Sequence, residues 1–388
     1  MLCETRSSSS KAIALGVHLE RRSFSCSVGA PDSSDGRLLL ERRKQRLWKQ
    51  GLAALLLLAV AAYGLSSPTW QHESRTPKSG GIGQAVCGAA ASLFVIRGYS
   101  TGRCQFWEYD SSVGVWRVLT EWTPPKSEPA TPIPRPKSGT ALAWDGEDRI
   151  YALFGGAGSD ARRVLFYVYE ISTNRWLRLA DSPHAQGAGN ALTWCGSDSS
   201  LYALLGSDKR GSSFARYAPA TDSWQLLALN PSWVCTDDGA SLAWGGGRYI
   251  YALSGEWEDA GPPHTDFAQY DREEDQWQDL APIPESDSYG GSAGVGDGGS
   301  LLWIGNWDSE EVDCVYALGG GGYREDPGYA FYRYRIPQDE WERLTDIPCP
   351  VGEWVGSRLG YAGGSIYCWQ GNKSSATCGG AVLLKWVP

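Results

Sequence analysis

The chain has 388 residues, with 35 Lys and Arg against 44 Asp and Glu, which gives a formal net charge of −9. The first 50 residues hold ten basic and five acidic side chains, so the remaining 338 hold 25 basic and 39 acidic side chains, a net charge of −14. An acidic body repels a phosphate backbone, which argues against nucleic-acid binding through a basic face. With 42% hydrophobic and 20% charged residues, the chain can bury a sizeable core, which excludes disorder throughout.

A short apolar segment follows the basic N-terminal region. Residues 51–65 form an uninterrupted run of 15 apolar or small residues, and five Lys or Arg lie among the ten residues before it. This pattern is typical of a signal peptide, and a helix of about 22 Å is short for a hydrocarbon core of about 30 Å. Fifty residues precede the run, so a translation start assigned too early and an uncleaved membrane anchor are both open.

These features divide the chain into three parts. We predict a disordered basic tail over residues 1–47, a signal peptide or membrane anchor over 48–66, and a folded domain over 67–388. The folded domain is then extracytoplasmic. It is either secreted or periplasmic, or it is anchored by a single N-terminal transmembrane helix.

A motif of three aromatic residues recurs five times in the folded domain. A Tyr follows a Phe by three residues and a Trp follows that Tyr by seven, with both spacings constant. The copies are Phe106/Tyr109/Trp116, Phe166/Tyr169/Trp176, Phe214/Tyr217/Trp224, Phe267/Tyr270/Trp277 and Phe331/Tyr334/Trp341. The constant spacing indicates tandem structural repeats, and we expect these fifteen large side chains to pack between them.

Two further patterns precede each motif. A short apolar segment runs into Gly in most copies, as in Ile150–Leu153 and Leu201–Leu204, and six copies can be counted between Leu93–Ile96 and Ile366–Trp369. Upstream of it, a segment that begins with Gly ends in Trp, as in Gly139–Trp144. Each repeat therefore contains four short strands, a to d, separated by turns. Six such units of about 50 residues predict an all-β, six-bladed β-propeller.

The repeats resemble those of kelch-type β-propellers. The resemblance rests on the Gly after strand b, the Tyr of strand c and the Trp of strand d, and it covers about residue 68 to the C-terminus. The double Gly survives only at Gly155-Gly156 and Gly319-Gly320 and is single or displaced in the other repeats. The chain is therefore similar to a divergent, bacterial-style kelch protein.

The last repeat ends before its strand d, and the missing strand is found at the other end of the folded domain. Trp70 is followed by Pro77–Gly80, as strand d of the first repeat is followed by Pro136–Gly139. We therefore predict that the N-terminal strand completes the last blade. This arrangement closes the ring and removes two exposed sheet edges.

Ten cysteines are present, and eight of them follow the apolar segment. An even number in an exported chain is compatible with disulfides. Cys368 in strand b and Cys378 before strand c flank one hairpin, so we predict that they pair; buried free thiols are the alternative. There is no CxxC, and we expect no metal and no cofactor.

The candidate ligand-binding residues lie in loops between strands d and a and between strands b and c, which emerge on one face of a propeller. They are Glu256, Trp257, Arg324, Glu353 and Trp354, in loops that also carry Trp233, Asp237, Asp238, Glu258, Tyr289 and Tyr323. Exposed aromatic side chains beside charged groups suit a carbohydrate or a protein hot spot. Solvated loops without a ligand are the alternative.

The sequence favours a binding module over an enzyme. We predict an exported or membrane-tethered propeller that presents the loop face to a glycan or protein, touches a membrane only through residues 48–66 and binds no nucleic acid. The alternative is a sugar mutarotase or epimerase, because the kelch-type propellers that the chain resembles include an exported sialic-acid mutarotase. Glu256, Arg324 and Glu353 would then supply the acid–base groups. The kelch-type propellers also include copper-radical oxidases, and His184 and His264 are the candidate copper ligands that this resemblance implies. Few histidines and no catalytic motif favour the binding module.

Overall fold

The computed structural model describes much of the folded domain and none of residues 1–67. The described residues are 68–81, 83–98, 104–122, 133–156, 165–184, 187–206, 212–231, 233, 236, 239–255, 264–285, 294–296, 298–305, 314–320, 330–349, 358–370 and 381–388. They all belong to one compact unit, Ser67–Pro388. Within them, no helix is long and apolar enough to cross a membrane. The predicted tail and the signal or anchor segment lie outside the described residues.

The described strands form six four-stranded antiparallel sheets, numbered here as blades I to VI in the order of their inner strands. Blade I is β2 (Ala85–Ala89), β3 (Ser92–Ile96), β4 (Cys104–Asp110) and β5 (Val115–Trp122). Blade II is β6 (Ala141–Trp144), β7 (Arg149–Leu153), β8 (Phe166–Glu170) and β9 (Arg175–Arg178). Blade III is β10 (Ala191–Cys195), β11 (Ser200–Leu205), β12 (Ser213–Ala218) and β13 (Ser223–Leu227).

The second half of the ring repeats this order. Blade IV is β14 (Ser241–Trp244), β15 (Tyr249–Leu253), β16 (Phe267–Asp271) and β17 (Gln276–Asp279). Blade V is β18 (Ser300–Ile304), β19 (Cys314–Leu318), β20 (Phe331–Arg335) and β21 (Glu340–Arg343), with a 3-10 turn, η2 (Ile336–Gln338), between the last two. Blade VI is β22 (Arg358–Ala362), β23 (Ser365–Gln370), β24 (Val382–Val387) and β1 (Thr69–Arg75).

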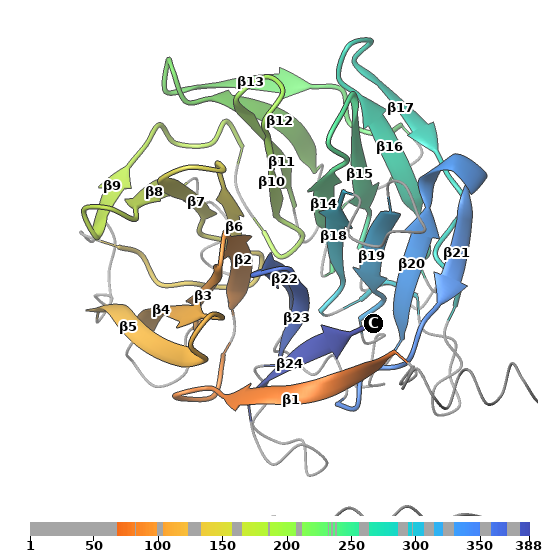
Figure 1. Ribbon diagram of the computed structural model, residues 1–388. Helices are drawn as coiled ribbons and strands as arrows, with labels where there is room; N and C mark the ends of the chain where they lie inside the picture. Colours follow the sequence, from red (N-terminus) through yellow and green to blue (C-terminus); the bar gives the residue numbers. More distant parts are fainter. Residues whose placement is uncertain are drawn as a thin grey trace, which may run out of the picture. The chain divides into compact units, whose positions relative to one another are not determined.

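The six sheets surround a central channel. The inner strands β2, β6, β10, β14, β18 and β22 lie nearest the centre, and each contacts the inner strands of both neighbouring blades (Figure 1). The all-β, six-bladed architecture predicted from the repeats is therefore confirmed. It follows from the sequence because each repeat supplies four short apolar segments and a turn after each of them.

The N-terminal strand completes blade VI, as predicted. In Figure 1 β1 lies beside β24, and the two strands pair antiparallel with Trp70 opposite Trp386. This pair occupies the place that Tyr109 and Trp116 hold in blade I. The indole Nε1 of Trp70 also donates a hydrogen bond to the Thr345 carbonyl oxygen of blade V, at 3.2 Å. The strand therefore joins two blades as well as closing the ring.

The Tyr and Trp of the repeated motif form a polar clamp between neighbouring blades. The Trp224 Nε1 of blade III donates to the Ala180 carbonyl oxygen of blade II at 3.1 Å. Asp222 Oδ1 accepts hydrogen bonds from the Tyr217 hydroxyl at 2.6 Å and from the Ala180 backbone N–H at 2.8 Å. Both polar groups of one peptide residue are thus bound by the next blade. The same arrangement recurs around Ala228, bound by blade IV, and around Ala281, bound by blade V.

The clamp predicts a specific stability difference at Asp222. Asp222 has φ of 46°, and Asn174 occupies the equivalent position of blade II with φ of 54°. Replacing Asp222 with Ala leaves the buried Tyr217 hydroxyl unpaired and places Ala in a left-handed conformation, so we expect a loss of about 2 kcal/mol in unfolding free energy. Asp222→Asn keeps an acceptor and tolerates this φ, so it should cost less than about 1 kcal/mol. Urea unfolding measures both. Equal costs for the two variants would contradict the clamp.

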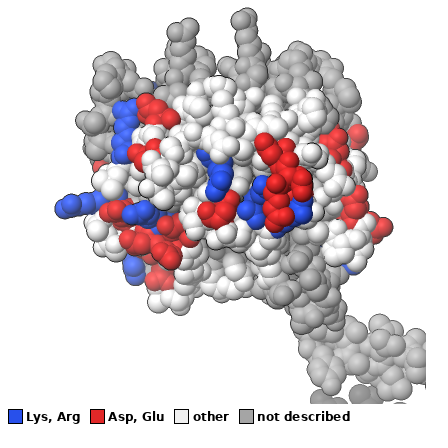
Figure 2. Space-filling view, turned by 90° about the horizontal axis from the view of Figure 1, so that it is seen from above, with Lys and Arg blue, Asp and Glu red and all other residues white. Residues whose placement is uncertain are grey.

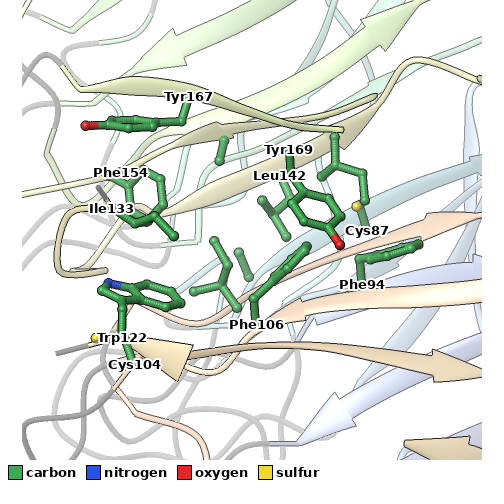
Figure 3. Close-up of a cluster of buried hydrophobic side chains, with 14 of the residues drawn as sticks. Cys87, Phe94, Cys104, Phe106, Trp122, Ile133, Leu142, Phe154, Tyr167 and Tyr169 are labelled. Carbon is green, nitrogen blue, oxygen red and sulfur yellow. The ribbon is translucent and has the colours of Figure 1, made fainter. Parts of the chain in front are cut away.

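The hydrophobic core is divided among the blade interfaces. Each of the six core clusters formed by the described residues joins two adjacent blades. Figure 3 shows the one between blades I and II, where the ring centroids of Phe106 and Tyr169 lie 4.8 Å apart. The ring centroid of Phe106 also lies 5.0 Å from that of Trp176. Burial raises the pKa of Tyr169 to about 12. The Phe and Tyr of every motif are at most 2% exposed, whereas the five Trp are half-buried. The motif is therefore mainly a packing signature.

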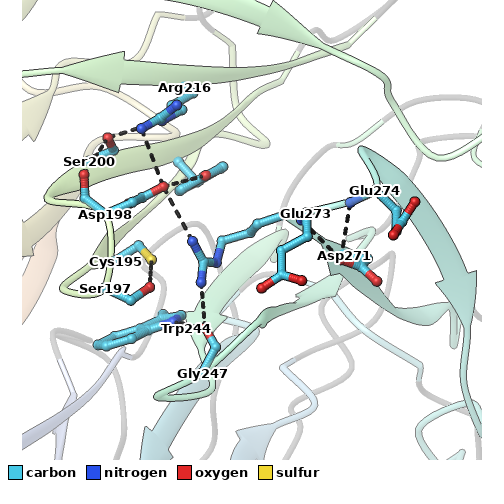
Figure 4. Close-up of polar contacts among 12 residues, drawn as sticks. Cys195, Ser197, Asp198, Ser200, Arg216, Trp244, Gly247, Asp271, Glu273 and Glu274 are labelled. Atoms are coloured by element: carbon cyan, nitrogen blue, oxygen red, sulfur yellow. Dashed lines mark hydrogen bonds and ion pairs between the residues drawn. The ribbon is translucent and has the colours of Figure 1, made fainter.

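A polar network joins the turns of blades III and IV on the face opposite the d–a and b–c loops. Asp198 Oδ2 accepts a hydrogen bond from the Tyr202 hydroxyl at 2.8 Å and lies 3.3 Å from Nη1 of Arg272 (Figure 4). Arg272 Nη2 donates in turn to the Gly247 carbonyl oxygen at 2.8 Å. This network therefore links the a–b turn of blade III to turns of blade IV.

Charges of both signs are interspersed on the surface seen in Figure 2. Among the described residues, Arg248 lies within 3.4 Å of carboxylate oxygens of Asp271, Glu273 and Glu274. On this side of the described residues, basic groups therefore stand beside carboxylates and do not form a continuous basic surface.

Candidate functional site

The loops between strands d and a and between strands b and c share one face of the ring. Each inner strand begins where the second strand of its blade ends, as the pairing of Ser241 with Leu253 shows. The backbones of adjacent loops also meet there. The Val295 N–H, before β18, donates to the His264 carbonyl oxygen, before β16, at 2.7 Å, and the Gly296 N–H donates to the Gly319 carbonyl oxygen at 3.0 Å. The ends of these loops are therefore fixed to one another at the channel mouth.

The five predicted ligand-binding residues, Glu256, Trp257, Arg324, Glu353 and Trp354, lie outside the described residues. The strand ends on which their loops are built do belong to this face. Residues 256 and 257 follow β15, Arg324 follows β19, and residues 353 and 354 precede β22. The convergence of these side chains on one ligand stays a prediction.

Trp233 has a different role from the one expected for it. The sequence placed it among the exposed loop aromatics, but it is only 6% exposed. Its ring lies 5.3 Å from that of Trp277, and it belongs to the core between blades III and IV. That prediction was wrong because an aromatic residue in a loop can also cover the end of an interblade core.

The channel mouth itself is lined by the first residues of the inner strands. These are small in five blades, Ala85, Ala141, Ala191, Ser241 and Ser300, and the sixth is Arg358. They surround a chamber of about 80 Å³. Arg358 is half-buried, and its Nη1 donates to the Gly299 carbonyl oxygen of blade V at 2.7 Å. A guanidinium held in this way can bind a carboxylate or another anion.

Arg358 is the one charged side chain among the described residues that line the channel. Sequence reasoning missed it. The signal was available, because five of the six aligned inner strands begin with Ala or Ser and only the last begins with Arg.

Comparisons with known proteins agree with the fold. No family model matches the chain. The chain is 26% identical over 262 residues to Kelch-like protein 36 of Bos taurus and 25% identical over 316 residues to Kelch-like protein 34 of Homo sapiens. These alignments cover 64% and 77% of this chain but only 38% and 44% of those proteins. The chain is a kelch-type six-bladed β-propeller.

Two solved structures share the fold of this kelch propeller. The structure of YjhT has a TM-score of 0.56 at 14% identity, over 80% of this chain and 95% of the other. A fungal alcohol oxidase of the AA5 family, in complex with copper, has a TM-score of 0.51 at 11% identity, over 83% and 77% of the two chains. At these identities the likeness concerns the fold alone.

The candidate copper ligands are both described. His184 Nδ1 forms a short hydrogen bond with the Ser213 hydroxyl, and the His264 carbonyl oxygen accepts the bond from Val295. No group of three or more His, Cys, Asp or Glu among the described residues of the kelch propeller is arranged to hold a metal ion.

The predicted disulfide between Cys368 and Cys378 does not form. Cys368 is a free, fully buried thiol in the core between blades V and VI, and burial raises its pKa to about 12. The predicted pairing with Cys378, which lies outside the described residues, was therefore wrong, because the alternation of β23 directs Cys368 into the core. Cys349 is disulfide-bonded instead. The cysteine that pairs with Cys349 lies outside the described residues. The Cys349 carbonyl oxygen accepts a hydrogen bond from Gln370 Nε2 at 3.0 Å.

Proposed function

We propose that this kelch propeller is a binding module, exported or membrane-tethered, whose d–a and b–c loop face binds a protein or a glycan. The observation that carries the proposal is the arrangement of loop ends around the channel mouth, where Val295, His264, Gly296 and Gly319 join neighbouring loops. A closed ring holds such loops on rigid strands, so that they can present side chains with little loss of entropy on binding.

The loop sequences supply suitable contact groups. Trp257 and Trp354 each follow a Glu, so an aromatic side chain and a carboxylate would be offered together by two loops. Indole faces stack on the C–H faces of a sugar or fill a pocket of a protein partner, and the carboxylates bind the polar edges.

Two Trp variants test the binding proposal. We expect Trp257→Ala and Trp354→Ala in the full-length chain to weaken binding on glycan and peptide arrays by about tenfold or more, with unfolding midpoints unchanged. Leu177→Ala, which removes an exposed side chain from the outer strand of blade II, is the control and should bind as the parent does. If both Trp variants bind as tightly as this control, the loop face is not the binding surface.

Export and tethering rest on the apolar segment at residues 51–65 and its basic flank. A cleaved signal predicts a released protein whose N-terminus lies shortly after residue 62, whereas an anchor predicts an intact N-terminus in the membrane fraction. Cell fractionation with N-terminal sequencing distinguishes the two. Recovery of the uncleaved chain in the cytoplasmic fraction would contradict both.

A second function, a sugar mutarotase acting on a carbohydrate such as sialic acid, is favoured by Arg358 alone. A guanidinium at the channel mouth suits the carboxylate of an acidic sugar, while Glu256 and Glu353 would exchange protons with the ring and anomeric oxygens. NMR of anomer interconversion tests this function. Glu256→Gln and Glu353→Gln should then lower turnover far more than affinity. A parent protein that interconverts sialic acid anomers no faster than buffer would exclude it.

A further inference from the structure

The opposite end of the channel carries a second chamber, built from the fourth residues of the same inner strands. These residues are aromatic in five consecutive blades: Trp144, Trp194, Trp244, Trp303 and Tyr361. They line a cavity of about 480 Å³, which we call the aromatic bowl. This volume lies in the range of small-molecule binding sites.

The floor of the aromatic bowl is aliphatic. The second residues of the inner strands are Val86, Leu142, Leu192, Leu242, Leu301 and Leu359, and they line both chambers of the channel. They form a collar that separates the small polar chamber beside Arg358 from the bowl. The two ends of the channel therefore offer different chemistry to a ligand.

The walls of the bowl are held in place by contacts outside it. Trp144 Nε1 donates to the Glu147 carbonyl oxygen at 3.1 Å, and Trp244 Nε1 donates to the Gly247 carbonyl oxygen at 2.8 Å. Trp194 stacks on Tyr151 with ring centroids 6.2 Å apart and an interplanar angle of 5°. The polar edges of two indoles are thus already bonded within the protein, while all five aromatic side chains stay half-buried.

Close backbone approach also shapes this chamber. A Cβ at Gly246 would lie 2.2 Å from the Trp303 ring, so the turn after β14 must be glycine for that ring to take its place. In blade I the position equivalent to Trp144 is Gly88, where a Cβ would lie 1.8 Å from the Tyr361 carbonyl oxygen. No side chain fits at the blade I position, so the ring of aromatic side chains has five members. The bowl exists without rearrangement of the inner strands.

The lining selects the class of ligand. Among the described residues, no charged side chain lines the bowl, so an ion entering it would lose hydration without a counter-charge. A sugar would place hydroxyl groups against the leucine collar, where they would lack partners. A cyclic hydrocarbon framework would instead bury apolar surface against both the collar and the indoles. We propose that the aromatic bowl binds a neutral, largely apolar small molecule with a planar or cyclic framework.

Fluorescence titration of the full-length chain with 6-propionyl-2-dimethylaminonaphthalene, a neutral aromatic probe, tests this proposal. We expect saturable binding at one site per chain and a blue-shifted emission. Trp144→Ala and Trp303→Ala, on blades II and V, should each weaken binding by about tenfold or more. Leu177→Ala, which changes an exposed residue of an outer strand, serves as the control. Any probe that binds to other apolar segments of the chain contributes the same background signal in all variants. Two wall variants keep the test open if one fails to fold.

Competition completes the test. Neutral 2-acetylnaphthalene should displace the probe, whereas 2-naphthoate and methyl β-glucoside should not do so at equal concentration. Probe affinity unchanged in both wall variants would overturn the proposal. So would displacement by naphthyltrimethylammonium at lower concentration than by the neutral ketone, because the bowl would then be a site for cations. Binding to the loop face is measured separately with Trp257→Ala, which should leave probe affinity unchanged.

Discussion

Deletion of residues 67–80 from the full-length chain is expected to abolish cooperative unfolding. The deletion removes β1, which pairs with β24 along its length and carries the Trp70 bond to Thr345 of blade V. It also removes Glu73 and Ser74, which accept hydrogen bonds from Tyr109 and Trp116 of blade I at 2.8 and 3.2 Å. Blade VI would thus be left with an exposed edge strand and with weakened contacts to both neighbours.

Calorimetry and light scattering measure this effect. We expect a broad transition or none, together with aggregation through the exposed β24 edge. Deletion of residues 1–47 is the matched control, because it removes more chain but none of β1, and it should leave the transition unchanged. A truncation of residues 67–80 that melts like the parent would show that the ring does not need its N-terminal strand.

The second large effect is expected at Trp277. Its ring centroid lies 5.0 Å from that of Phe214 and 5.3 Å from that of Trp233. The Trp277 Nε1 donates a hydrogen bond to the Ala228 carbonyl oxygen at 2.8 Å. Trp277→Ala should therefore cost about 3 kcal/mol of unfolding free energy, at the low end for removing a large aromatic side chain because Trp277 is half-buried.

Urea unfolding compares this variant with Leu226→Ala. Leu226 is 49% exposed on the outer strand of blade III, so its removal should change stability by less than about 0.5 kcal/mol. A cost below about 1 kcal/mol for Trp277→Ala would contradict its packing role. The motif Trp residues would then have to be reconsidered as binding residues.

The fold was predictable because packing between blades repeats with the sequence. Phe166, Tyr217 and Trp224 come from two adjacent repeats and meet at one interface, with Phe166 4.8 Å from Tyr217 and 4.9 Å from Trp224. A contact made by every pair of neighbours must be encoded in every repeat, so a constant spacing is visible in one sequence. Trp70 could be assigned for the same reason, since it supplies the aromatic side chain that the last repeat lacks.

The sites were less predictable, because they depend on single departures from the repeat. Arg358 replaces a small residue in one inner strand, and its meaning appears only when six strands are placed around one channel. The aromatic bowl is a similar case: Trp144 and Trp303 are 159 residues apart in the sequence, yet they line the same chamber. Trp233 and Cys368 were misassigned because loop position and hairpin spacing do not report whether a side chain faces the core.

Hydrogen–deuterium exchange of the unmodified chain tests the central claim, a ring closed by β1, most directly. If β1 is the outer strand of blade VI, the amides of Thr69–Arg75 should exchange as slowly as those of Ser223–Leu227, the outer strand of blade III. Both should exchange about 100-fold or more slower than unstructured peptides. Exchange of Thr69–Arg75 at the unstructured rate, with Val382–Val387 still protected, would contradict closure of the ring.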